Sequence, residues 1–169
     1  ILGVGLYLMP AGGREPVVAA PGPPPNQDWT VVCPSNGQTC LVSATATRNG
    51  QRISVAVGTT YRGHRTARIA ATNMLQPKAV NGDRLASVMV TGVRLDDEPA
   101  YGVTCEGYRQ SVAMMSCQID SGAFDSFVQS LRRARRIIVA TANDAEVAID
   151  ARNFAAAWQQ VERRVVDGR

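Results

Sequence analysis

The sequence predicts a mainly β protein: a disulfide-stabilised β-sandwich with two short helices near the C-terminus, preceded by an apolar segment and a proline-rich linker. Three observations lead to this prediction. Short alternations of apolar and polar residues follow one another from Trp29 onward and are separated by turn residues. Four cysteines form two widely spaced sets. After Ile119 the apolar period changes from that of a strand to that of a helix.

The chain divides into an N-terminal extension and one domain. Residues 1–12 begin with the uncharged run Ile1–Met9, which is shorter than the roughly 20 apolar residues that span a bilayer. We therefore expect either the end of a transmembrane anchor or the remnant of a signal peptide, and we favour the anchor. Residues 13–27 are rich in proline, which is typical of an extended spacer. The sandwich domain is expected at residues 28–169.

The domain begins with strands that can form hairpins. Trp29–Cys33 and Thr39–Thr47 read as two strands joined by a turn, so Cys33 and Cys40 can face each other. Asn49-Gly50 is a strong tight-turn signal, and it leads into a third strand at Gln51–Val57. Further strands are expected at Arg65–Ala71, Leu85–Thr91, Val103–Cys105 and Val112–Ile119.

The last part of the domain carries the two helices. The first is predicted by apolar residues at helical spacing, with Asp120 or Ser121 as its cap: Phe124, Phe127, Val128 and Leu131. Strands at Arg136–Thr141 and Glu146–Ile149 follow. A closing helix is predicted by Phe154, Ala157, Trp158, Val161 and Val165, with Asp150 as its cap.

The cysteines are Cys33, Cys40, Cys105 and Cys117. Neither set has the Cys-x2-Cys spacing that is typical of zinc or thioredoxin-like redox sites. We therefore expect two disulfides and an oxidising compartment. Four cysteines allow three pairings, and the predicted hairpins favour Cys33–Cys40 and Cys105–Cys117, although the sequence alone leaves the connectivity open.

The cysteine pattern, Trp29-x-Val31-x-Cys33 and the C-terminal elements together resemble the invasion-associated locus B family of bacterial envelope proteins. The segments Asp120–Leu131 and Arg136–Ala140 resemble the family's late helix and strand, and Asn153-Phe154 with Ala157 resembles its closing helix. Two glycines of the family pattern are replaced by Ser116 and Asn153, and the second cysteine pair is more widely spaced than usual. The resemblance implies a disulfide-bonded, exported β-sandwich without an established catalytic activity.

Other polar residues suggest weaker alternatives. His64 is the only histidine, and no carboxylate beside it in the sequence would orient it for catalysis. The run Asp96–Glu98 lacks the alternating spacing of a calcium loop, so a solvated turn is favoured. We predict no catalytic, cofactor-binding or metal-binding residue. One set of arginines is a candidate surface for an anion or an acidic partner: Arg62, Arg65, Arg68, Arg132, Arg133, Arg135 and Arg136.

These features predict a non-enzymatic interaction domain. We expect it on the periplasmic side of the bacterial inner membrane, as an accessory subunit of a membrane protein complex. Its partners would be membrane protein subunits, with membrane attachment through the N-terminal segment and no nucleic acid. The alternative is an exported or cell-surface protein involved in host interaction or invasion. An enzyme that uses His64 is the least favoured hypothesis.

Overall fold

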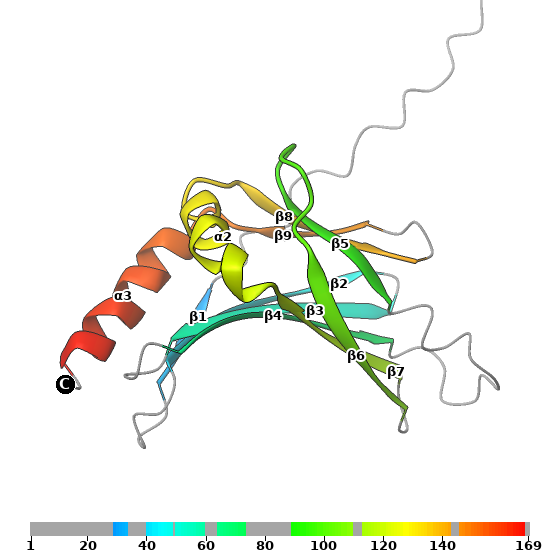
Figure 1. Cartoon of the computed structure of the whole chain (residues 1–169), viewed down its shortest axis with the longest axis horizontal. Coiled ribbons are helices and arrows are strands. Elements are labelled where there is room, and N and C mark those ends of the chain that lie inside the picture. Colours follow the sequence, from blue (N-terminus) through cyan, green and yellow to red (C-terminus); the bar gives the residue numbers. More distant parts are fainter. Residues whose placement is uncertain are drawn as a thin grey trace, which may run out of the picture.

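In the part of the chain that the structure describes, two antiparallel sheets and two helices enclose an apolar core (Figure 1). The computed structural model describes residues 29–33, 40–48, 50–59, 64–73, 89–109, 113–142 and 146–167. The predicted mainly β sandwich with two late helices is confirmed. The expected anchor at residues 1–12 and the linker at residues 13–27 lie outside the described residues. In the described part of the chain, no helix has both the length and the apolar character needed to span a membrane.

The larger sheet has six strands in the order β1-β2-β3-β4-β7-β6. Its side chains alternate between the core and the outer face, as expected of strands that are covered on one side. Gly50 has a φ of 74°, a conformation that suits glycine and that allows the tight turn between β2 and β3. The strands are β1 (Thr30–Val32), β2 (Cys40–Arg48), β3 (Gln51–Thr59), β4 (Arg65–Asn73), β6 (Val103–Arg109) and β7 (Ala113–Ile119).

The smaller sheet has the order β5-β8-β9, with β5 at Val90–Leu95, β8 at Arg136–Thr141 and β9 at Glu146–Asp150. The expected strand at Leu85–Thr91 is wrong in position, because β5 begins after Met89; residues 85–88 lie outside the described residues. The register with β8 shifts between Val90 and Gly92. This irregularity hides the alternation that continues through Val93 and Leu95.

Two helices complete the layer that faces the larger sheet. A 3-10 turn at Ser121–Ala123 leads into α2 (Phe124–Leu131), and α3 spans Phe154–Asp167. Asp120 occupies the position before the 3-10 turn but makes no side-chain capping bond. Asp150 was expected to cap α3, and this is wrong: Asp150 ends β9, and its carboxylate accepts the backbone N–H of Arg152 at 2.9 Å.

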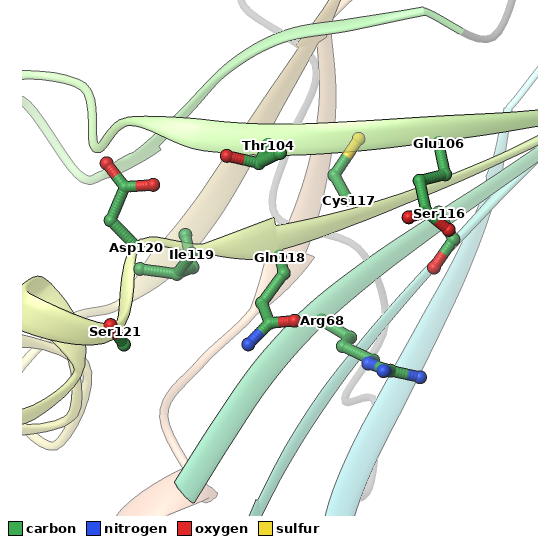
Figure 2. A pocket seen from close by; sticks show the side chains of 9 residues that line it. All are labelled: Arg68, Thr104, Glu106, Ser116, Cys117, Gln118, Ile119, Asp120 and Ser121. Carbon is green, nitrogen blue, oxygen red and sulfur yellow. The ribbon is translucent and has the colours of Figure 1, made fainter.

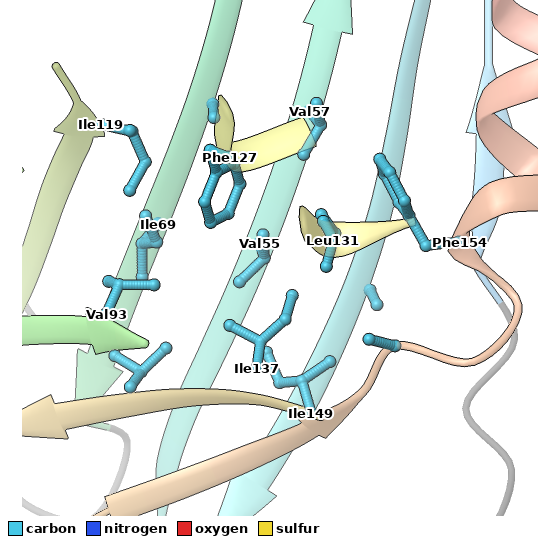
Figure 3. Close-up of a cluster of buried hydrophobic side chains, with 14 of the residues drawn as sticks. Val55, Val57, Ile69, Val93, Ile119, Phe127, Leu131, Ile137, Ile149 and Phe154 are labelled. Atoms are coloured by element: carbon cyan, nitrogen blue, oxygen red, sulfur yellow. The ribbon is translucent and has the colours of Figure 1, made fainter. Parts of the chain in front are cut away.

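The core lies between the sheets and beneath α2 (Figure 3). Phe127 and Leu131 point from α2 toward the inner face of the larger sheet, and both are fully buried. The apolar spacing that predicted both helices is therefore confirmed. The core residues labelled around these two are Val55, Val57, Ile69, Val93, Ile119, Ile137, Ile149 and Phe154.

Both disulfides join neighbouring strands or their ends. Cys33 and Cys40 have Cα atoms 4.2 Å apart and extend the pairing of β1 with β2. Cys105 and Cys117 lie directly opposite each other on β6 and β7, with Cα atoms 4.0 Å apart. The predicted pairing is confirmed. Two such bonds are compatible with an oxidising, extracytoplasmic location.

Candidate functional site

The outer face of the larger sheet carries polar side chains in register. Arg68, Gln118 and Thr104 stand in one row across β4, β7 and β6. Ser116 and Glu106 follow in the next row, opposite Ala70. These polar side chains line a hollow of about 360 Å³ (Figure 2). Its lining also includes Cys117, Ile119, Asp120 and Ser121.

This outer hollow presents charges of both signs together with neutral donors and acceptors. Arg68 and Gln118 are exposed, and so are Glu106 and Asp120. Gly102 leaves room for Asp120, because a Cβ at Gly102 would lie 2.7 Å from Asp120 Oδ2. Such a surface is suited to hydrogen bonding with a polar partner, while the apolar side chains of the same strands face the core.

A second hollow, of about 430 Å³, lies between α2 and α3 at the ends of β3 and β4. We call it the α2–α3 groove. Phe124, Val128 and Trp158 are almost completely buried and form its floor, and the rings of Phe124 and Trp158 are 6.3 Å apart. The rest of its lining comes from Thr59, Arg65, Asp125, Gln129, Arg132, Glu162 and Val165.

Two ion pairs flank the floor of the α2–α3 groove. Arg65 of β4 pairs with Asp125 of α2, and its guanidinium carbon lies 6.0 Å from the centre of the Phe124 ring. Arg132, just after α2, pairs with Glu162 of α3 at 2.5 Å. Glu162 also accepts a hydrogen bond from Trp158 Nε1 at 3.0 Å. Both arginine side chains are a third or more exposed, at 50% and 36%, and can therefore be reached from solvent.

The seven arginines predicted as one candidate surface lie in several places. Arg65 and Arg132 line the α2–α3 groove, whereas Arg68 lines the outer hollow. Arg133, Arg135 and Arg136 are exposed at the corner between α2 and β8. Arg62 lies outside the described residues. Sequence spacing could not separate these groups, because arginines from different strands and helices meet only in the folded chain.

Asp96 holds the α2–β8 corner in place. Its carboxylate accepts hydrogen bonds from the backbone N–H groups of Arg135, at 3.0 and 3.2 Å, and Arg136, at 2.9 Å. Its backbone has a φ of 48°, a left-handed conformation that aspartate tolerates better than most residues. The run Asp96–Glu98 lies in a turn as expected, but the bracing role of Asp96 was missed. An aspartate at a turn was the available signal.

Among the described ion pairs, that of Asp150 with Arg152 has the clearest effect on a pKa. Arg152 Nε lies 3.0 Å from both carboxylate oxygens of Asp150, which is 4% exposed. Hydrogen bonding from the Arg152 side chain lowers the pKa of Asp150 and outweighs the effect of burial, which raises it. The pair lies in the connection between β9 and α3, so its ion pairing stabilises the conformation of that connection.

His64 is exposed immediately before β4. Within the described ranges, no group of three or more histidine, cysteine, aspartate or glutamate side chains is placed to hold a metal ion. No protein-family model, curated protein or solved structure matches the chain. The resemblance to the invasion-associated locus B family therefore remains a prediction.

Proposed function

We propose that this chain is a non-enzymatic interaction domain, tethered to the inner membrane of a bacterium and facing the periplasm, where it serves as an accessory subunit of a membrane protein complex. The observation that carries this proposal is the pair of cross-strand disulfides in the domain that follows the apolar Ile1–Met9 and its proline-rich spacer. An anchor and a spacer would hold the sandwich beside neighbouring membrane proteins.

The distribution of polar groups supports a role in binding a protein partner. The outer hollow and the α2–α3 groove both offer charged and neutral hydrogen-bonding groups to solvent. By contrast, Asp96 and Asp150 bind backbone N–H groups and fix the loops around them. The exposed groups of the two hollows thus face solvent, where a polar partner could contact them, whereas Asp96 and Asp150 serve the fold.

The test is gentle purification of the protein from native membranes, followed by mass spectrometry of the intact chain and its companions. Stoichiometric membrane subunits, together with a chain that retains Ile1–Met9, would support the accessory-subunit role. A chain that is cleaved near Ala20 and purifies alone would overturn it. That result would favour the alternative, an exported or surface protein of the kind that the family resemblance implies.

A further inference from the structure

The α2–α3 groove combines an apolar floor with two arginines that reach it from different elements. Arg65 comes from β4, whereas Arg132 follows α2. Between them lie the rings of Phe124 and Trp158 and the side chain of Val128. The volume of about 430 Å³ falls within the range of small-ligand sites. A ligand that joins an anionic group to an apolar one would match both features of this groove.

Both arginines retain capacity to bind such an anion. A guanidinium has five N–H donors, and the salt bridge of Arg132 uses its Nη2 atom. Asp125, the partner of Arg65, is 78% exposed, so this pair opens at little cost in free energy. The planar donor array of a guanidinium can bind both oxygens of a carboxylate, the group that every free peptide C-terminus carries.

The acids of the rim distinguish a peptide from a simple fatty acid. Asp125 and Glu162 can accept hydrogen bonds from backbone N–H groups, and the Gln129 amide can both donate and accept. A peptide end offers N–H donors to these carboxylates in addition to their bonds with Arg65, Arg132 and Trp158, whereas a fatty acid offers none. The mixed charge of the rim therefore favours a chain terminus over a free lipid acid.

We propose that the α2–α3 groove binds the C-terminal residue of a partner chain, with the terminal carboxylate between Arg65 and Arg132 and a large apolar side chain against Val128 and Trp158. The proposal rests on the interaction role proposed above and names the end of the partner that is recognised. The groove proposal can fail while the accessory-subunit role still holds, because its experiment uses the purified chain and needs no membrane complex.

The probe is the peptide acetyl-Gly-Ser-Gly-Leu-Phe with a free carboxylate, titrated into the full-length, oxidised chain. The protein has only two tryptophans, so its indole N–H signals in a nitrogen–proton NMR spectrum report on separate places. The Trp158 signal is expected to shift on binding, because this indole bonds Glu162 in the groove. The Trp29 signal is the internal reference, because that indole bonds Asp150 in the interior.

Replacing the terminal carboxylate with an amide is expected to weaken binding about 10-fold or more, because charge-assisted hydrogen bonds are lost. Arg65→Gln and Arg132→Gln should each weaken binding of the acid peptide about 5-fold or more. Arg163→Gln removes the same charge from α3 outside the groove lining and should leave binding unchanged.

Several results would overturn the proposal. Equal affinity for the acid and amide peptides would show that the carboxylate takes no part in binding. Decanoate that binds as tightly as the acid peptide would make a free lipid acid the ligand. Failure of the acid peptide to move the Trp158 signal at millimolar concentration would exclude the site. The comparison of acid with amide uses the unmodified protein, so it stands even where an arginine variant does not fold.

Discussion

The indole Nε1 of Trp29 donates a hydrogen bond to the backbone carbonyl of Asp150, 3.0 Å away and 121 residues later in the chain. Trp29 lies just before β1, whereas Asp150 ends β9, so this bond links the two sheets. The Trp29 ring also meets Phe154 edge to face at 5.0 Å. The start of the described domain, the end of the smaller sheet and the first turn of α3 are thereby fixed together.

Trp29→Phe is expected to destabilise the domain by about 1–2 kcal/mol, because the Asp150 carbonyl loses its buried donor. Trp29→Ala should cost about 3–5 kcal/mol, since it also leaves a cavity. Urea unfolding of the oxidised protein measures both. Trp158→Phe is the matched control: it removes the same ring atoms from a similarly buried side chain, but its indole bonds the half-exposed carboxylate of Glu162, which water can solvate, so the expected loss is smaller by about 1 kcal/mol. Equal losses for the two phenylalanine variants would contradict the linking role of Trp29.

Asp150 should make the stability of the domain depend on acid pH. Its pKa in the folded chain lies below the ordinary value of 3.8, chiefly because of hydrogen bonding from Arg152. Between the lowered pKa and 3.8 the unfolded chain binds more protons, so stability falls as the pH falls through this window. Above 3.8 the contribution is fully present. Asp150→Asn should be less stable at neutral pH, and its difference from the wild type should shrink in acid.

Urea midpoints measured for both proteins between about pH 2 and pH 7 test this dependence. Glu162→Gln is the control, because its carboxylate also pairs with an arginine but lies in the more exposed groove. A difference between Asp150→Asn and wild type that stays constant across the whole range would show that the Asp150 carboxylate contributes through packing alone.

The two disulfides should stabilise the domain by about 2–3 kcal/mol each through restriction of the unfolded chain. The bond Cys105–Cys117 closes a longer segment than Cys33–Cys40, with a sequence separation of 12 against 7. Cys117 is also almost completely buried, at 1% exposed. The double variant Cys105→Ala/Cys117→Ala should therefore lose more stability than Cys33→Ala/Cys40→Ala. The reverse order in urea unfolding would contradict this account.

Substitutions of Asp96 should lower the free energy of unfolding by graded amounts. Asp96→Gly keeps the left-handed backbone accessible but removes the acceptors of the Arg135 and Arg136 N–H groups, at an expected cost of about 2 kcal/mol. Asp96→Ala should cost about 1 kcal/mol more, because alanine disfavours this conformation. Asp96→Asn, which retains an acceptor, should lose least. Thermal unfolding of the three variants checks the order, and equal losses for alanine and asparagine would contradict the bracing role.

Regular alternation made much of the fold predictable. The apolar residues Ile53, Val55 and Val57 fall on one face of β3 and are fully buried, and the period of α2 was equally clear. The strand β5 was misplaced because its register is irregular around Gly92. The cap expected at Asp150 was wrong for a different reason. The short side chain of Asp150, at the end of β9, accepts the backbone N–H of Arg152, which is nearer than the first turn of α3.

The two hollows were not predictable from the sequence. Arg65, Asp125 and Glu162 belong to three different elements, and only packing of α2 and α3 at the ends of β3 and β4 brings them around one groove. The row of Arg68, Gln118 and Thr104 likewise depends on the pairing of β4 with β7 and of β7 with β6. A local pattern can indicate a hairpin such as β6 with β7, but not the pairing of β4 with β7, which β5 and β6 separate along the chain.

The central proposal, that this domain acts by contact with a membrane protein partner, is tested most directly by site-specific photo-crosslinking in intact cells that naturally produce the protein. A photoreactive residue would replace Gln118 in the outer hollow or Gln129 at the α2–α3 groove, with the exposed Gln160 of α3, outside both hollow linings, as the control. We predict a discrete adduct with one membrane protein from at least one of the two hollows and none from Gln160. Full-length, oxidised protein that yields no adduct from either hollow would contradict the account.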